Sequence, residues 1–464
     1  MSAPSTTDYD SYIHEPNNRE LGHIPGEYGL PIIGQTIPFL RDPYEWAKRQ
    51  HKKFGLLSRV NTAGSNGVLA LGPDLMQQIM LDPGRDFSSK MGFMDNVSKF
   101  FSDSLIMEDF EHHKHQRRIL QAAFKNDALK TYTADINRIY DRALAEWAND
   151  SGQTILFFDY IKNLLLEVAA EIFVGETERG ERVEKLNQAF SDCVAGTMYM
   201  VPYNIPGTRL YKGLKGKAYL ERFFTELVPR KRNAANMDGE QKGQDMLSHV
   251  CREKDEDGDY YTDKEIANQM IFLLFAAHDT TTAAITHTIY YLARNPEVKQ
   301  KLYDECLAIG KDNLEHEDLN NVPYMQQVFN EVQRLRPSAP MVPRRTIREV
   351  DMLGHSVPAH TMVYIFPRFS HCMPEYWSDP ESFDPDRFSP ERAEHKQHPF
   401  LFHPFGGGAH KCIGMHFSQM EYKCFIYKFI LNFDFESQHR KEPKMMTLPI
   451  PRPADKMPIR LIRR

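Results

Sequence analysis

Helical periodicity dominates the central part of the chain. Apolar residues recur three and four positions apart from about residue 114 to 310, for example over 134–147 and 161–173. This spacing is typical of amphipathic helices. Two later stretches, 324–335 and the segment from after Cys412 to about Asn432, predict helices in the C-terminal third. We therefore predict a mainly α-helical protein.

The longest predicted helix begins near residue 263. Thr262 followed by Glu265 forms a capping box, and Asp263 suits the positive end of a helix. The pattern then continues without a breaker to Arg294, and Pro296 favours an end there. A helix of this length spans about 45–50 Å. Its middle is apolar, which predicts that it is buried.

Strand patterns are confined to two regions. Residues 56–72 read as a hairpin around a turn at 63–67, and 350–353 and 362–366 are strand-like. A proline-rich, aromatic meander follows over 367–404. Turn formers crowd residues 25–31, so we predict a flexible N-terminal arm over 1–24 and one domain over 25–464.

Composition and charge exclude several classes of protein. The 464 residues include 57 Lys plus Arg and 63 Asp plus Glu, a net charge of −6, and 41 % are hydrophobic. With 29 Phe, 21 Tyr and 21 Met the chain can fill a large core, which argues against disorder. The mildly acidic balance argues against nucleic acid as the main partner, because phosphate binding needs clustered basic residues.

The six cysteines are scattered, and no two have the spacing of a zinc or iron–sulfur site. They are also too few for a disulfide-rich secreted scaffold. The N-terminus is polar and acidic, without the basic and apolar regions of a signal peptide. Apolar runs such as 271–277 are far shorter than a bilayer span. We therefore predict a soluble cytoplasmic protein without a transmembrane anchor.

Residues 405–414, called the Cys loop below, carry the strongest chemical signal. Three consecutive glycines let the backbone approach a flat ligand. Cys412 follows at the predicted start of a helix, where the helix dipole favours a thiolate, and His410 and Lys411 add positive charge. Such a thiolate is a nucleophile or a metal ligand. For a lone cysteine, a buried structural role is the commoner alternative.

The Cys loop resembles the haem-binding signature Phe-x-x-Gly-x-x-x-Cys-x-Gly of the cytochrome P450 superfamily. Phe405, Gly408, Cys412 and Gly414 occupy its fixed positions. His410 stands where the family usually has Arg, as in sterol 14-demethylases, and is expected to contact a haem propionate. The resemblance implies that Cys412 is the proximal thiolate ligand of the haem iron.

Two more elements of the family precede the Cys loop. Glu331 and Arg334 match its E-x-x-R motif on a helix, and Arg387 lies in a match to its F-x-P-x-R-F element at 383–388. A single E-x-x-R is usually a surface salt bridge. The order of all three elements implies instead a buried Glu–Arg–Arg network with a structural role, which holds the meander that carries the Cys loop.

The middle of the long helix resembles the family's [AG]-G-x-[DE]-T pattern. Asp279 and Thr280 would then help deliver protons to dioxygen, while Ala277 replaces the usual Gly and is expected to narrow the oxygen groove. Threonine in a helix often donates to a carbonyl one turn back. We expect this of Thr281 and Thr282, but not of Thr280.

Basic residues elsewhere match the family's propionate-binding positions. His113 and Arg117 are four apart on one predicted helical face and can both reach a carboxylate. Arg344 stands ten residues before Gly354, as in the family's R-x9-G strand arrangement. The neighbouring His112, His113 and His115 suggest a zinc site, but no cysteine or acidic pattern completes it.

The resemblance covers about residues 25–460. It implies the P450 fold, mainly α with a large helical lobe and small β-sheets, and haem b between the long central helix and the Cys-bearing helix. No G-x-G-x-x-G follows a strand, so electrons must come from a separate protein. Positive charge at Lys114, His410 and Lys411 suits an acidic ferredoxin or flavodoxin.

The implied function is hydroxylation of an apolar substrate with O2. Residues 85–107, 198–211 and 448–451 match the family's substrate-recognition regions. The Cys-loop histidine and the His-Asp-Thr-Thr segment at 278–281 favour the sterol-demethylase and retinoid-hydroxylase branch, hence a steroid, terpenoid or fatty acyl substrate. Two alternatives are a peroxide-driven P450 peroxygenase, whose known form replaces the acid–Thr pair with Arg–Pro, and a non-catalytic haem-thiolate ligand-binding protein.

Overall fold

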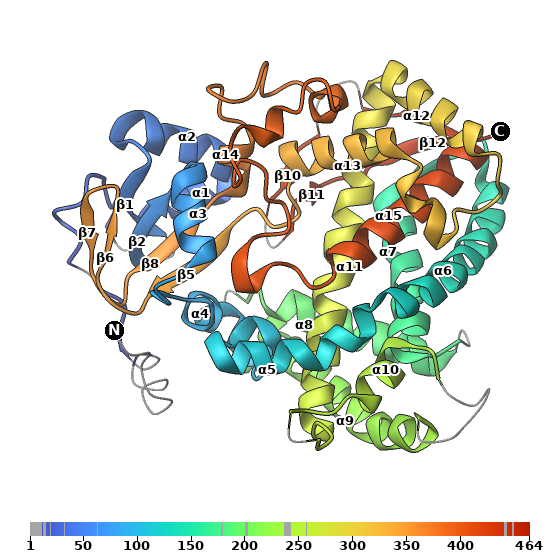
Figure 1. Cartoon of the computed structure of the whole chain (residues 1–464), viewed down its shortest axis with the longest axis horizontal. Coiled ribbons are helices and arrows are strands. Elements are labelled where there is room, and N and C mark those ends of the chain that lie inside the picture. The colour runs from blue at the N-terminus through green and yellow to red at the C-terminus, as the bar shows by residue number, and fades with distance from the viewer. Residues whose placement is uncertain are drawn as a thin grey trace.

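The structure, a computed structural model, describes most of the chain. The described residues are 12, 15–18, 20–31, 33–62, 64–177, 180–199, 203–235, 243–256, 258–439, 443–447 and 450–464. They form a large helical lobe and a smaller lobe built around a β-sheet (Figure 1). The mainly helical fold predicted from the sequence is confirmed.

Fifteen α-helices occur in the described residues. They are α1 (Thr36–Arg41), α2 (Pro43–Phe54), α3 (Pro73–Leu81), α4 (Ser89–Phe101), α5 (Phe110–Gln121), α6 (Asn126–Trp147), α7 (Phe157–Val168), α8 (Glu181–Gly196), α9 (Arg209–Ala235), α10 (Met246–Arg252), α11 (Asp263–Arg294), α12 (Pro296–Ile309), α13 (Pro323–Leu335), α14 (Pro367–His371) and α15 (Met415–Asn432). A π-helical segment, Ala169–Val174, extends α7.

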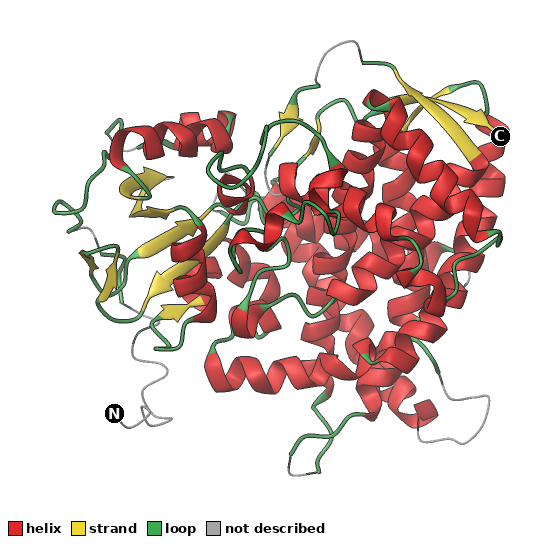
Figure 2. Cartoon of the chain, turned by 45° about the horizontal axis from the view of Figure 1, so that its top comes forward, coloured by secondary structure: helices red, strands yellow, loops and turns green. Residues whose placement is uncertain are grey.

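The strands form one larger sheet and three small ones. They are β1 (Leu57–Thr62), β2 (Ser65–Ala70), β3 (Phe87–Ser88), β4 (Thr154–Leu156), β5 (Val342–Thr346), β6 (Val350–Met352), β7 (His355–Val357), β8 (Met362–Ile365), β9 (Phe433–Ser437), β10 (Met445–Met446), β11 (Arg452–Pro453) and β12 (Pro458–Arg463). The five-stranded sheet has the order β1-β2-β8-β5-β3, in which β2 and β8 are parallel and the other neighbours antiparallel. The C-terminal strand β12 pairs with β4 and β9 beside the helical lobe (Figure 2).

Helix α11 passes through the middle of the helical lobe (Figure 1). Its capping box is present, because Thr262 Oγ1 accepts from the Glu265 N–H at 3.2 Å and Glu265 Oε2 accepts from the Thr262 N–H at 2.9 Å. Its apolar residues belong to the main core, where α11 contacts α7, α9, α13 and α15. The predicted position and burial of the long helix are confirmed.

Other local predictions are also confirmed. The hairpin over 56–72 is β1–β2, although residues 65–67 of the expected turn belong to β2, the helix over 324–335 is α13, and the last helix is α15. Only the family resemblance, through the R-x9-G arrangement of Arg344, pointed to strand β5, because Val-Pro-Arg-Arg-Thr lacks the apolar alternation of a strand. The buried Arg344 and Arg345 of β5 lie between β8 and β3, so only the sheet explains their burial.

The predicted N-terminal arm falls partly outside the described residues, which omit 1–11, 13–14 and 19. The described part from 15 to 24 contacts the β-lobe. Asn17 Nδ2 donates to the Asn66 carbonyl at 2.5 Å, and its Oδ1 accepts from the Met362 N–H at 3.2 Å. Leu21 and Ile24 are fully buried in the core of that lobe.

The lack of a membrane anchor was also predicted. Within the described ranges, no helix combines the length and the apolar character needed to cross a bilayer.

Candidate functional site

The Cys loop joins the meander to α15 and is closed by backbone hydrogen bonds. The Cys412 N–H donates to the Phe405 carbonyl at 2.9 Å, and the Lys411 N–H donates to the Gly408 carbonyl at 3.2 Å. The Phe405 ring stacks on Phe329 of α13, with centroids 6.1 Å apart, which anchors the start of the loop. Cys412 therefore stands at a defined position three residues before α15, close to where the sequence predicted a helix start.

Two glycines of the Cys loop have left-handed backbone conformations. Gly406 has φ +69° and Gly408 has φ +61°. A Cβ atom on Gly408 would collide with the Met80 carbonyl oxygen of α3. A Cβ atom on Gly406 would lie 3.9 Å from the His410 carbonyl oxygen, which is an ordinary contact. Gly408 is thus required both by its backbone angle and by the close approach of α3. Gly414 has an ordinary φ of −84° and has no such constraint.

We expect Gly408→Ala to destabilise the protein and to lower its haem content. Overpacking costs about 1–3 kcal/mol, and the left-handed conformation adds about 1–2 kcal/mol for a residue with a Cβ. Thermal unfolding and the ratio of haem to protein measure the effect. Gly406→Ala is the matched control, because it carries the backbone strain without the collision. Equal losses in the two variants would contradict the collision.

Cys412 differs from the other five cysteines, all of which are buried, in having an exposed side chain. At the same time burial raises the pKa of its thiol, while the Gly414 N–H and the charges of Arg117 and Lys411 act in the opposite direction. Both observations fit a sulfur that lines an internal space rather than the outer surface. Coordination to a metal ion would oppose the effect of burial and favour the thiolate.

Four basic residues gather near Cys412 and are called the basic cluster below. They are His113 and Arg117 on α5, Arg344 on β5 and His410 in the Cys loop. The rings of His113 and His410 lie with centroids 4.0 Å apart. Arg344 is buried, and its Nη1 donates to the Pro343 carbonyl at 2.9 Å. The structure thus brings together the four residues that the sequence placed at haem propionates.

The electrostatic surroundings of the basic cluster differ between its histidines and Arg344. Burial lowers the pKa of His113 to about 4, and the charges of Arg117 and Arg344 lower it further. The pKa of His410 is lowered by burial and by the other three bases. Burial also lowers the pKa of Arg344 to about 10, against the attraction of Asp109 and Asp82. Every charge that acts on the two histidines is positive. This donor set fits a ligand with carboxylates, such as the propionates of haem.

Histidines 112, 113 and 115 do not form a metal site. His115 Nε2 faces Glu265 Oε1 at 3.4 Å, whereas His113 is buried against His410. In the part of the chain that the structure describes, no group of three or more His, Cys, Asp or Glu side chains is placed to hold a metal ion.

The threonines of α11 differ partly from the expectation. Thr280 Oγ1 donates to the Ala276 carbonyl at 2.8 Å, so the prediction that it would not bond back to the helix was wrong. Thr282 donates to the His278 carbonyl at 2.8 Å, as predicted. Thr281 makes no such bond. It lies instead beside Glu421 of α15, whose carboxyl pKa burial raises to about 8.

Asp279 is partly accessible, with 17 % of its side chain exposed. Its Oδ1 lies 2.9 Å from Nδ1 of His278, the preceding residue. Burial acts to raise the pKa of Asp279, but the contact with His278 and the positive charges of Lys162 and Arg452 outweigh it, so the pKa lies below its usual value. From the sequence, His278 belonged to the His-Asp-Thr-Thr segment but had no predicted role, because its contacts with Asp279 and α7 are not visible in the local pattern.

Glu331, Arg334 and Arg387 form a buried network that links α13 to the meander. Arg334 Nε and Nη2 donate to the two oxygens of Glu331 at 2.6 and 2.8 Å, and Arg387 Nε donates to Glu331 Oε1 at 3.2 Å. These three side chains are at most 1 % exposed. The two arginines also donate to carbonyl groups of the meander, at His371, Asp379, Pro380 and Ser382.

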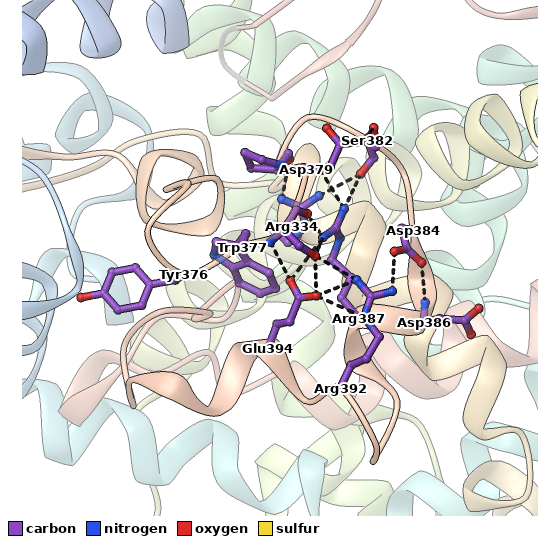
Figure 3. Close-up of polar contacts among 12 residues, drawn as sticks. Arg334, Tyr376, Trp377, Asp379, Ser382, Asp384, Asp386, Arg387, Arg392 and Glu394 are labelled. Atoms are coloured by element: carbon purple, nitrogen blue, oxygen red, sulfur yellow. Dashed lines mark hydrogen bonds and ion pairs between the residues drawn. The ribbon is translucent and has the colours of Figure 1, made fainter.

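The network extends beyond the residues that the sequence predicted (Figure 3). Arg387 Nη1 contacts Glu394 Oε2 at 3.2 Å, and Arg392 binds both Glu394 and Asp384 at 2.6 Å. These partners lie in irregular segments, where no periodicity shows which side chains face inward. The arrangement ties the meander to α13 and so supports the position of the Cys loop that follows.

Comparison with known proteins agrees with this geometry. The family model described as Cytochrome P450 matches residues 24–457. The chain is 35 % identical over 449 residues to the putative cytochrome P450 136 of Mycobacterium tuberculosis, covering 96 % of this chain and 89 % of the relative. It is 26 % identical over 452 residues to the beta-amyrin 28-monooxygenase of Solanum lycopersicum, covering 95 % and 93 %. The solved structure of retinoic acid bound cyanobacterial CYP120A1 matches with a TM-score of 0.84 at 25 % identity, covering 95 % of this chain and 99 % of that one.

Proposed function

The chain belongs to the cytochrome P450 family and is a monooxygenase, and we propose that it hydroxylates a large apolar substrate of the terpenoid or steroid class. The observation that carries this proposal is the position of Cys412. Cys412 is exposed although burial raises the pKa of its thiol, and it stands beside the basic cluster in a loop that contacts α3 and α13. A fatty acyl substrate is the next class to test.

We assign haem b as the form of the family's haem. Cys412 would ligate the iron through its thiolate, and the basic cluster would hold the two propionates. When bound, haem supplies the chemistry of dioxygen activation and C–H oxidation. The negative propionates would also act against the positive charges that lower the pKa of His113 and His410.

An apolar wall beside Thr280 supports an apolar substrate. Phe275, Ala276 and Ala277 of α11 are half-buried. The Phe275 ring lies against Phe101 of α4, with centroids 4.5 Å apart. Apolar side chains of this kind suit the rigid hydrocarbon rings of terpenoids and steroids. The names of two relatives, which refer to beta-amyrin and retinoic acid, support the terpenoid class.

The substrate entrance is proposed at α4 and the segment 198–211. Lys99 Nζ of α4 donates to Tyr199 Oη at 3.1 Å, which connects the two. Tyr203 and Ile205 are exposed in the same segment. Residues 200–202, and residues 448–449 of the third expected substrate segment, lie outside the described residues.

Asp279 and Thr280 are proposed to deliver protons. Because the Thr280 hydroxyl donates to the Ala276 carbonyl, its oxygen can accept a hydrogen bond from water in the site. Asp279 is ionised at neutral pH and reaches solvent, so it can collect and pass on protons. Retention of this acid–alcohol pair favours dioxygen rather than peroxide as the oxidant.

Electrons come from a separate protein, and we propose a ferredoxin or flavodoxin with an acidic surface. Lys411 in the Cys loop and Lys114 on α5 are exposed, and they present positive charge near the haem ligand and the basic cluster. We also propose a cytoplasmic location, supported by six cysteines that are all free thiols.

Turnover of the purified holoenzyme tests the function. We expect triterpenes or steroids to be hydroxylated when ferredoxin, its reductase and NADPH are supplied. Fatty acids and hydrogen peroxide serve as the comparison substrate and oxidant. Product with peroxide alone would indicate a peroxygenase. Tight binding without product under either condition would indicate a ligand-binding protein.

A further inference from the structure

His278 on α11 places both of its ring nitrogens against oxygen atoms. Its Nδ1 lies 2.9 Å from Asp279 Oδ1, and its Nε2 lies 3.0 Å from the Lys162 carbonyl oxygen on α7. The His278 side chain is only 1 % exposed, so these two oxygens, rather than bulk water, are its partners. Both distances are those of ordinary hydrogen bonds. The number of protons on the ring can therefore be inferred from what its two partners can donate or accept.

A backbone carbonyl and an ionised carboxylate can only accept hydrogen bonds, while a neutral imidazole has one N–H to donate. A neutral His278 beside an ionised Asp279 would leave a nitrogen lone pair facing an oxygen lone pair. The contacts at Nδ1 and Nε2 are both satisfied when His278 and Asp279 together hold one proton more than a neutral imidazole and an ionised carboxylate do. We propose that His278 and Asp279 store this proton as an imidazolium beside a carboxylate, with His278 as a positioning residue that supplies protons to Asp279.

The charges that face the pair place the proton on the ring. Besides His278, the charged groups Lys162 on α7 and Arg452 on β11 act on Asp279, and both favour its ionised form. With the carboxylate ionised, the Nδ1 contact requires an N–H on the ring. The Nε2 contact to the Lys162 carbonyl requires a second N–H. In the proposed arrangement, a proton on each ring nitrogen satisfies one of these two acceptors.

The remaining surroundings of His278 are largely apolar. The Phe190 ring of α8 meets it edge-on, with centroids 5.5 Å apart. A cavity of about 10 Å³, lined mainly by apolar side chains of α7, α8 and α11, lies against the ring. A space of that size is at the lower limit for one water molecule, which would need several polar partners. Proton exchange with solvent therefore runs through Asp279.

The catalytic use of this proton rests on the proposed function. The presence of the proton on His278 rests only on the hydrogen-bond geometry. In the proposed step the N–H bond at His278 Nδ1 breaks and an O–H bond forms at Asp279 Oδ1. The carboxyl then gives the proton to water in the site, and solvent returns a proton to the pair. Nothing is oxidised or reduced in this exchange. His278 would thus hold a proton close to Thr280, while Asp279 exchanges protons with solvent.

Nitrogen-15 NMR of the histidine rings tests the stored proton directly. The holoenzyme, labelled at histidine nitrogens, is measured in its diamagnetic ferrous carbonyl form near neutral pH. The His278 signals are assigned by their loss in His278→Gln. We expect both nitrogens to be protonated. A ring with one protonated nitrogen would overturn the proposal, even if the variant did not fold well enough for assays.

Turnover gives the second readout. Gln keeps a hydrogen-bonding side chain but cannot hold the extra proton. We expect His278→Gln to slow product formation by about 10- to 100-fold, since positioned proton transfer contributes about 100- to 10,000-fold and Asp279 remains. The wild-type rate should fall at high pH as the pair loses its proton, and the variant should lack this limb. A wild-type rate and pH profile in the variant would overturn the proposal.

His287→Gln is the matched control. His287 lies nine residues further along α11 and is equally buried, but neither of its ring nitrogens has a hydrogen-bond partner among the described residues. We expect its rate and pH profile to match the wild type. If His278 is doubly protonated but the enzyme forms no product, the stored proton is supported and only the proposed function is contradicted. If the enzyme turns over normally but the ring holds one proton, the proposed function is supported and the stored proton is contradicted.

Discussion

Replacing Cys412 with Ser is expected to abolish both the thiolate-type spectrum and hydroxylation. Cys412 is the only exposed cysteine of the six, and the Cys loop places it beside the basic cluster. A serine hydroxyl is a harder and much less acidic ligand than a thiol, so it does not replace the electron donation of a thiolate to the iron. The carbonyl difference spectrum and product formation measure the two losses.

Cys424→Ser is the control for this substitution. Cys424 lies on α15, twelve residues after Cys412, and burial raises the pKa of its thiol to about 12, so it is not a thiolate at neutral pH. We expect this variant to keep the position of the carbonyl band, whatever stability it loses. A thiolate-type band that persisted in Cys412→Ser would contradict the ligand assignment.

The second large effect is expected at Glu331. In Glu331→Gln, Arg334 and Arg387 would lose the carboxylate that joins them at 2.6–3.2 Å in a site at most 1 % exposed. Removing one partner of a buried ion pair costs about 3–5 kcal/mol, because the remaining charge is left uncompensated. We expect a loss of this size in the free energy of unfolding, measured with urea. The Cys loop should also retain haem less well, because the meander is tied to α13 through this network.

Asp386→Asn provides a matched test of that result. Asp386 precedes Arg387 and pairs with Lys301 at 2.6 Å, but both side chains of this pair are about half exposed. Exposed pairs contribute about 0–1 kcal/mol, so the same chemical change should have little effect here. Similar losses in Glu331→Gln and Asp386→Asn would show that burial of the network is not what stabilises the meander.

Much of the helical framework could be predicted from local pattern. Helices α11, α13 and α15 begin and end close to where capping residues, prolines and apolar spacing place them. These signals act within one turn of a helix and need no partner. The strand β5 lacked such a signal, because its residues are buried by β8 and β3, which come from distant parts of the chain.

The candidate site divides in a similar way. Motif resemblance predicted Cys412, the basic cluster and the Glu331 network by residue. The partners Arg392 and Glu394 were not predicted, because they lie in irregular segments of the meander. Thr280 was expected not to bond to the helix, yet its hydroxyl donates to Ala276. Whether a threonine hydroxyl bonds to its own helix or to another group depends on which other partners lie within hydrogen-bond distance.

From the sequence alone, the residue types and their order determined the family, the long central helix and the cysteine expected to bind iron. Tertiary structure decided which charged and hydrogen-bonding groups meet. His278 illustrates the difference, because its two acceptors are the next residue and a carbonyl on α7, 116 positions earlier. Hydrogen-bond partners and burial are set by packing between distant segments, and these determine which groups carry charge.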